Sequence, residues 1–255
     1  VVAMVLRRRR VQRLAERARA PILCFGDSLT EGYLGVWHSP CAPQSPPNAD
    51  RDELVHVRFR PYAVRLGARL AVQADPAALI HVGLGLRYAE TRAYSGWTAA
   101  ELLPRLEAAL RGGPWRAAVI LAGTNDIVME GANAEVAARR VRALWHACDR
   151  QGVTVVAVAP PDCATEYHGV VPPTDKGRRR DELAGLNKLI HEMARAECRA
   201  LVDARTVIPS QLPADKPGHK EAARFWDDST HFSVLGSDTL ADAIFEALQP
   251  VLQRA

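Results

Sequence analysis

An alternation of short apolar runs with amphipathic segments is the feature of this sequence that most constrains its fold. Five runs rich in Val, Ile, Leu or Ala carry the alternation: residues 21–25, 79–84, 117–123, 153–160 and 200–204. Helical patterns separate these runs and begin near Pro61, Thr98, Asn133, Asp181 and Val234. Apolar strands that alternate with amphipathic helices are typical of a parallel sheet covered on both faces. The sequence therefore predicts an α/β fold with about five parallel strands and helices on both faces.

Several helix ends carry their own signals. The segment TAAE, which begins at Thr98, has the pattern of a capping box. Asn133 precedes another helical pattern as an N-cap, and Gly152 follows that pattern as a stop. Pro104 falls past the first turn of its predicted helix, so we expect it to bend or weaken the helix there.

The length and charge of the chain indicate one domain with a basic N-terminal arm. A chain of 255 residues is an ordinary size for one α/β domain. Much of the net charge of +4 lies in residues 1–20, which we expect to form a basic helical arm, whereas residues 21–255 form a single domain and are close to neutral. Nucleic acid is therefore not a predicted partner.

Cysteine usage and hydropathy bear on the compartment of the protein. The five cysteines are scattered without a C-x-x-C pair, which indicates neither a disulfide framework nor a zinc site. No apolar run approaches the length of a membrane span, so no stable membrane insertion is expected. The sequence thus favours a cytoplasmic protein, although the Arg-rich start leaves organelle targeting open.

The stretch FGDSLTEGY places a serine, Ser28, directly after the first predicted strand. In open α/β sheets, ligands bind at the edge formed by the carboxyl ends of the strands. Ser28 is therefore a candidate nucleophile. The alternative is a polar turn, because Gly, Asp and Ser are common turn residues for conformational reasons.

Three further blocks follow in order: AYSGWT with Gly96, LAGTNDI with Asn125, and WDDSTHF with Asp228 and His231. Together with the Ser28 block, they resemble the GDSL or SGNH hydrolase family, whose name gives the Ser, Gly, Asn and His of these blocks. The resemblance extends from about residue 25 to residue 236. It implies a three-layer, flavodoxin-like fold, with residues 21–255 as one catalytic domain.

The residue types fit acyl transfer. A serine hydroxyl needs a base, and His231 is the candidate; Asp228, three residues earlier, is placed to orient its imidazole, although Asp227 is an adjacent alternative. The resemblance assigns the oxyanion hole to the backbone N–H groups of Ser28 and Gly96 and to the side-chain amide of Asn125.

Each block also has a plain structural interpretation. Gly96 fits a turn before the Thr98 cap, and Asn125 fits a turn after a strand. His231 fits a polar residue near a helix start that Ser233 caps. The order of all four blocks favours the catalytic interpretation.

Two long segments, residues 34–52 and 160–180, follow predicted strands and are expected to be irregular rim loops. Asp27, Trp37 and Tyr167 are candidate substrate-binding residues. The expected substrate is a small-molecule carboxylic ester with a short acyl chain, and neither a metal nor a cofactor is implied. Lysophospholipase, thioesterase and carbohydrate acetylesterase activities, or a non-catalytic binding module of the same fold, remain alternatives. The sequence does not predict an oligomeric state.

Overall fold

The structure is a computed structural model that describes residues 20–37, 56–74, 89–163, 175–212 and 215–254. Its centre is a five-stranded parallel sheet with the strand order β4-β1-β5-β6-β7. The strands are β1 (Ile22–Gly26), β4 (Ala89–Ala93), β5 (Ala117–Leu121), β6 (Thr154–Ala159) and β7 (Ala200–Asp203). The predicted α/β fold with five parallel strands is confirmed.

Burial explains why three of these strands, β1, β5 and β6, are visible in the sequence. All residues of β1 and β5 are buried, and so are all but the first residue of β6. A strand covered on both faces needs apolar side chains on both sides, which gives a continuous apolar run. In the register of the sheet, Gly26 lies between Ala93 and Leu121, so three strands end at the same level.

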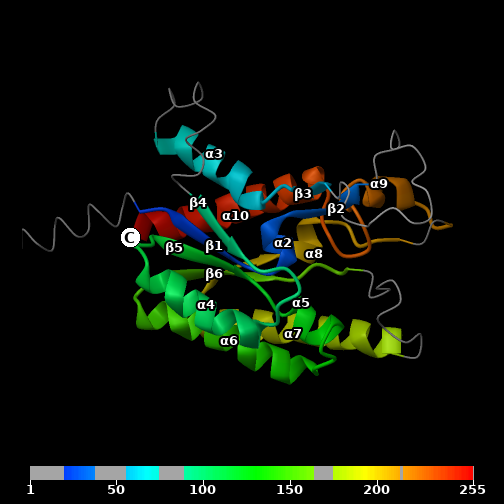
Figure 1. Cartoon of the computed structure of the whole chain (residues 1–255), viewed down its shortest axis with the longest axis horizontal. Coiled ribbons are helices and arrows are strands. Elements are labelled where there is room, and N and C mark those ends of the chain that lie inside the picture. The colour runs from blue at the N-terminus through cyan, green and yellow to red at the C-terminus, as the bar shows by residue number, and fades with distance from the viewer. Residues whose placement is uncertain (1–19, 38–55, 75–88, 164–174, 213–214, 255) are drawn as a thin grey trace, which may run out of the picture.

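Helices form the two outer layers of the domain. In Figure 1, α3 and α10 cover one face of the sheet, and α4, α6 and α7 cover the other. These long helices are α3 (Tyr62–Ala74), α4 (Ala99–Arg111), α6 (Ala134–Arg150), α7 (Lys176–Ala196) and α10 (Val234–Arg254). The short helices are α2 (Ser28–Glu31), α5 (Thr124–Val128), α8 (Ala204–Val207) and α9 (His219–Ala223). Because α2, α5 and α8 directly follow β1, β5 and β7, they lie together at one end of the sheet (Figure 1).

The helix ends predicted from Thr98, Asn133 and Gly152 agree with the structure. Thr98 and Glu101 form the capping box, because the Thr98 hydroxyl accepts from Glu101 N–H and the Glu101 carboxylate accepts from Thr98 N–H. Asn133 caps α6, which ends just before Gly152. Helix α4 continues through Pro104, from Ala99 to Arg111, and a bend or weakening at this proline stays a prediction.

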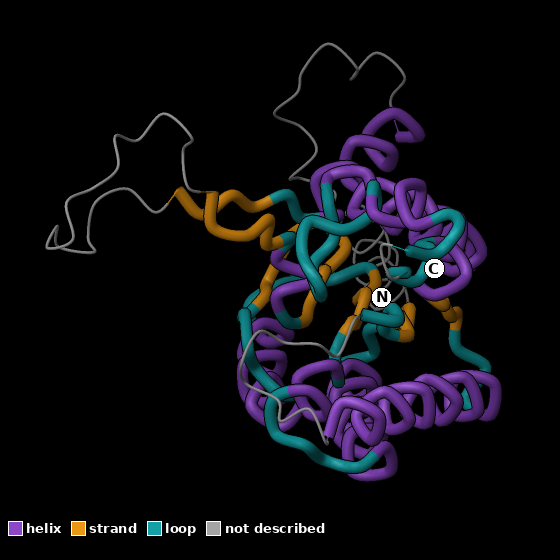
Figure 2. Tube along the Cα trace, turned by 90° about the vertical axis from the view of Figure 1, so that its right-hand side faces the viewer, coloured by secondary structure: helices purple, strands orange, loops and turns teal. Residues whose placement is uncertain are grey.

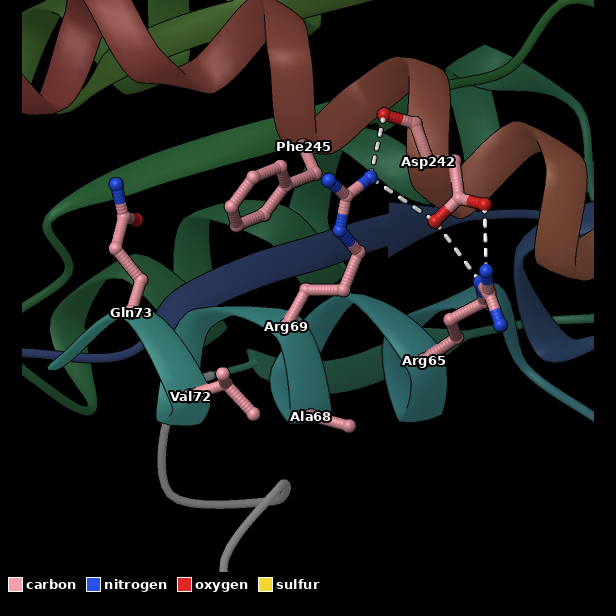
Figure 3. Close-up of a pocket in the computed structure, with 7 residues that line it drawn as sticks. All are labelled: Arg65, Ala68, Arg69, Val72, Gln73, Asp242 and Phe245. Atoms are coloured by element: carbon pink, nitrogen blue, oxygen red, sulfur yellow. Dashed lines mark hydrogen bonds and ion pairs between the residues drawn. The ribbon is translucent and has the colours of Figure 1, made fainter. Parts of the chain in front are cut away.

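Helices α3 and α10 are joined by an ion-pair cluster beside an open groove of about 630 Å³ (Figure 3). Arg65 donates to both carboxylate oxygens of Asp242, at 2.8 and 2.7 Å. Arg69 donates to Asp242 at 3.0 Å and to Glu246 at 2.9 Å, and its guanidinium lies 3.8 Å from the centre of the Phe245 ring. Solvent-accessible ion pairs of this kind are worth about 0 to 1 kcal/mol each, so they add little to the stability of the packing between α3 and α10.

Some predicted boundaries need correction. Strands β2 (Tyr33–Trp37) and β3 (His56–Phe59) form an antiparallel pair that projects from the body of the molecule (Figure 2). The first part of the supposed irregular segment 34–52 is therefore a strand. Helix α7 begins at Lys176, five residues before the predicted start at Asp181.

The sheet edge also differs from expectation. The edge strand β4 is Ala89–Ala93, a segment that the apolar pattern did not reveal. The strand predicted at residues 79–84 and the basic arm at residues 1–20 lie outside the described residues, apart from residue 20.

Candidate active site

The turn between β1 and α2 presents Ser28 at the end of the sheet. Strand β1 ends at Gly26, where a Cβ atom would lie 2.0 Å from the Leu121 carbonyl oxygen, so the close approach of β1 to β5 requires glycine. Asp27 caps α2, with Oδ1 accepting from Leu29 N–H at 3.1 Å. Ser28 is the first residue of α2 and is 8 % exposed. Its backbone N–H belongs to the first helical turn, where donors have no partner within the helix.

The loop before α10 brings a histidine to this serine. The His231 Nε2 atom lies 3.0 Å from Ser28 Oγ, and the His231 Nδ1 atom lies 2.7 Å from Asp228 Oδ2. A carboxylate accepts hydrogen bonds, so it selects the tautomer in which Nδ1 carries the proton and Nε2 accepts from the hydroxyl. Ser28, His231 and Asp228, from opposite ends of the chain, therefore form one chain of hydrogen bonds.

Asp228 is fixed by its own loop. Its Oδ1 atom accepts from the backbone N–H groups of Thr230 and His231, each at 2.7 Å. Burial acts to raise the pKa of Asp228, but the side-chain and backbone hydrogen bonds from His231 outweigh it and hold the pKa below its usual value. Asp228 is thus favoured in the ionised form that an imidazole partner needs.

The neighbouring carboxylate is turned to solvent. Asp227 contributes its backbone N–H to the His231 carbonyl oxygen, at 2.9 Å, and its residue is exposed. Partial desolvation, together with the charge of Asp228, raises the pKa of Asp227. The imidazole hydrogen bond is made by Asp228, as the D-x-x-H spacing predicts. His231 also precedes a capped helix, since Ser233 Oγ accepts from Gly236 N–H at 3.2 Å.

Gly96 and Asn125 come from two further segments. Gly96, in the loop between β4 and α4, has φ +78°, and a Cβ atom there would meet nothing within 4 Å, so the residue borders open space. Asn125 is in the first turn of α5, and its Nδ2 donates to the Trp97 carbonyl oxygen at 3.0 Å. A carbonyl only accepts, so this bond fixes which end of the Asn125 amide faces the loop and leaves a second N–H on the same nitrogen.

The structure describes the three candidate substrate-binding residues to different extents. Asp27 is 1 % exposed, and burial, opposed by the Leu29 hydrogen bond, raises its pKa to about 7. Contact between Asp27 and a substrate stays a prediction. Trp37 is the last residue of β2, but the position of its side chain is not described, and Tyr167 lies outside the described residues.

Sequence reasoning missed several contacts that surround these residues. Asp126 and Arg140 bind the segment after Gly96 to α5 and α6, and Ser95 hydrogen-bonds to Glu31 of α2. The position of Asp126 directly after Asn125 was the only signal in the sequence.

The described part of the chain shows neither a cluster of metal-ligating side chains nor a membrane-spanning helix. Its His, Cys, Asp and Glu side chains form no group of three or more with the spacing of a metal site. None of the helices in these ranges is both long and apolar enough to cross a membrane.

Solved structures share this fold. An inhibitor-bound aryl esterase from M. smegmatis is 19% identical, with a TM-score of 0.60, and the match covers 91% of this chain and 99% of that one. The lipase/acylhydrolase from Enterococcus faecalis is 18% identical, with a TM-score of 0.61 and coverages of 91% and 96%. A GDSL-like lipase from Bacteroides thetaiotaomicron is 16% identical, with a TM-score of 0.59 and coverages of 96% and 97%.

At these identities the structural matches establish the fold alone. No curated protein matches the sequence. The model of the GDSL-like Lipase/Acylhydrolase family matches residues 24–238, which is most of the chain and includes all four sequence blocks. The chain therefore belongs to the GDSL-like lipase/acylhydrolase family.

Proposed function

We propose that this protein is a serine esterase that cleaves carboxylic esters through an acyl-enzyme. The observation that carries the proposal is the continuous hydrogen-bond chain from Ser28 Oγ through His231 to Asp228, with contacts of 3.0 and 2.7 Å. Nucleophile, base and orienting carboxylate are the parts that acyl transfer to a serine requires.

In the first half of the reaction, Ser28 Oγ attacks the ester carbonyl carbon while His231 Nε2 takes the hydroxyl proton. The carbonyl oxygen becomes an oxyanion, for which the N–H groups of Ser28 and Gly96 and the Asn125 amide are the proposed donors. The tetrahedral intermediate then collapses, the bond to the alcohol oxygen breaks, and His231 gives its proton to the leaving alcohol.

In the second half, water repeats the sequence on the acyl-enzyme. His231 takes a proton from water, the resulting hydroxide adds to the acyl carbon, and Ser28 leaves with the proton that His231 returns. Asp228 keeps the imidazole in the required tautomer and stabilises its positive charge at both stages. No metal or organic cofactor takes part in these steps.

Labelling with a fluorophosphonate probe tests the proposal. The wild-type protein should become modified at Ser28, as peptide mapping will show, and Ser28→Ala should lose both labelling and ester hydrolysis while it keeps its fold. Labelling of Ser28→Ala would place the nucleophile elsewhere, and an unlabelled wild type would refute the serine mechanism.

The substrate class needs a separate assay. We propose short-chain carboxylic esters, and the solved aryl esterase of the same fold supports the choice of aryl acetates and butyrates as first substrates. The panel should also include long-chain esters, acetylated sugars, lysophospholipids and acyl-CoA. A higher kcat/KM on any of these would replace the proposed substrate while it leaves the mechanism intact.

A further inference from the structure

The proposed oxyanion donors lie on segments that are separate in the sequence. Gly96 belongs to the loop between β4 and α4, whereas Asn125 belongs to α5, which follows β5. Both must reach one oxygen atom, and a displacement of about 1 Å is enough to cost about a hundredfold in rate. Some contact must therefore hold the two segments at a fixed spacing.

Two hydrogen bonds join these segments. Asn125 Nδ2 donates to the Trp97 carbonyl oxygen at 3.0 Å, and Asp126 Oδ2 accepts from the Ala99 backbone N–H at 2.7 Å. Ala99 is the first residue of α4. Adjacent side chains of α5 thus hold the backbone on the C-terminal side of Gly96.

Asp126 is built into the domain as a buried, paired carboxylate. Its side chain is 0% exposed, and its Oδ1 atom accepts from Arg140 of α6 at 3.0 Å. Arg140 also forks onto the exposed carboxylate of Glu130. Burial raises the pKa of Asp126, while the bonds from Ala99 and Arg140 oppose the rise. Both oxygens of this costly buried group therefore have partners, and one partner is the loop of the proposed oxyanion hole.

The other side of the loop is tied to the nucleophile segment. The Tyr94 backbone N–H donates to the Gly26 carbonyl oxygen at 3.0 Å, and the Ser95 hydroxyl donates to Glu31 of α2. Gly96 thus lies between a connection to the Ser28 segment and a connection to the Asn125 segment.

We propose that Asp126 is a positioning residue of the oxyanion hole. Its carboxylate holds the start of α4, and with it the N–H of Gly96, at a fixed distance from Asn125 Nδ2. Gly96 itself has no side chain and borders open space, so its position depends on these neighbouring contacts. The inference rests on the proposed esterase function and assigns Asp126 no contact with the substrate.

The first test is Asp126→Asn. A carboxamide oxygen can accept from only one of the two donors, Ala99 N–H and Arg140, and its NH₂ group faces the other donor. We expect kcat to fall by about tenfold to a hundredfold, with KM changed by less than about threefold, because the misplaced donor acts in the transition state. The rate of fluorophosphonate labelling should fall in proportion, since the phosphonyl oxygen occupies the same hole.

A second pair of variants tests the same bond from the other side, and it remains informative if Asp126→Asn does not fold. Ala99→Pro removes the N–H donor at the first helical position, where proline is favoured. Thr98 already has the extended backbone, φ −75° and ψ 162°, that a following proline requires. Ala99→Pro should reproduce the fall in kcat, whereas Ala99→Gly keeps the donor and should stay near wild type.

Thr98→Ala is the control for a merely structural effect. It removes the Thr98 hydroxyl, which caps the same helix and hydrogen-bonds to Glu101, while the Ala99 N–H that Asp126 accepts from is kept. Its melting temperature should fall, while kcat should change by less than about twofold. An equal loss of kcat in Thr98→Ala, or an unchanged kcat in Ala99→Pro, would overturn the inference. Failure of the proposed function would look different, because wild-type Ser28 would then not be labelled.

Discussion

The described residues contain two aspartate–histidine pairs with nearly the same contact distance, made through different ring nitrogens. His231 Nδ1 lies 2.7 Å from Asp228, and His191 Nε2 lies 2.8 Å from Asp203. The imidazole of the first pair is sheltered, with 8% of the His231 side chain exposed against 42% for His191, whereas the carboxylates have the reverse order, 35% for Asp228 and 10% for Asp203. The pairs also differ in what else each member contacts.

The two pairs differ in the other hydrogen bonds that their members make. The remaining nitrogen of His231 faces Ser28, while Asp203 shares its carboxylate with Arg205, which donates from two nitrogens at 3.0 and 2.8 Å. Burial acts to raise the pKa of Asp203, but the bonds from Arg205 lead the contacts that hold it below the usual value. In the proposed mechanism, two features distinguish the His231 pair: its imidazole is sheltered from water, and the other nitrogen of that imidazole faces a hydroxyl.

The largest expected contrast is between the two histidines. His231→Ala removes the proposed base, so kcat should fall by about 10⁴ or more. His191→Ala changes an exposed ring on α7, so kcat should stay within about twofold of wild type. Steady-state hydrolysis of one aryl acetate, with circular dichroism to verify folding, makes the comparison. A comparable loss in His191→Ala would show that the exposed pair contributes to the reaction.

The aspartates should give the next largest contrast. Asp228→Asn keeps the shape of the side chain but presents the wrong partner to His231, so kcat should fall by about 10² to 10⁴ at neutral pH. Asp203→Asn and Asp227→Asn should each cost less than about tenfold, because Asp203 contacts Arg205 and His191 and not His231, and because the exposed charge of Asp227 is screened by solvent. If Asp227→Asn is the crippled variant, the orienting carboxylate has been misassigned by one residue.

Besides a base and an orienting carboxylate, the proposed reaction requires an oxyanion hole, and the proposal places none beside the His191 pair. Asn125→Ala should lower kcat by about 10² to 10³ with a much smaller change in KM, because the amide donates chiefly in the transition state. Asn133→Ala is the matched control, since it removes a carboxamide that only caps α6. An effect of Asn125→Ala confined to KM would make Asn125 a substrate-binding residue instead.

The sequence predicted the fold best where the sheet is buried on both faces. Strands β1, β5 and β6 are continuous apolar runs because neither face of these strands meets water. Strand β4, with the sequence AETRA, was missed because an edge strand is only partly covered and needs no apolar run. The hairpin of β2 and β3 was missed for a related reason: it stands away from the core, and in the described part of the chain its two strands pair with each other and not with the central sheet.

The residues of the candidate site also fall into a group that the sequence predicted and a group that it did not. Ser28, Asp228 and His231 were predicted because family blocks mark them, and the structure brings them within hydrogen-bond distance. Asp126 and Arg140 were not predicted, since their contacts join segments 27 and 14 residues apart through a backbone N–H and a guanidinium. Such contacts depend on how helices pack, which periodicity does not encode.

The smallest expected effect concerns stability, where the two aspartates should behave alike. Both have a pKa below the usual 3.8, which means that the folded protein favours their ionised forms. A carboxyl whose pKa is lower in the folded protein than in the unfolded protein stabilises the fold at any pH above its unfolded-state pKa. This stabilisation is lost as the pH falls through its folded-state pKa. Asp203→Asn and Asp228→Asn should therefore both destabilise the protein at pH 7, each by about 1 kcal/mol after allowance for solvent screening.

Urea denaturation of both variants and the wild type at pH 7 and at pH values below 3.8 measures this effect. The loss relative to wild type should shrink at the lower pH, because protonation removes the charge that the substitution removes. Asp181→Asn, on the exposed side of α7, is the control and should show no such trend. A destabilisation of Asp203→Asn that stays constant down to low pH would mean that its hydrogen-bond geometry, not its charge, stabilises the fold. The two pairs would then differ in their contribution to the free energy of unfolding as well as in chemistry, because ionisation would stabilise the folded protein at Asp228 but not at Asp203.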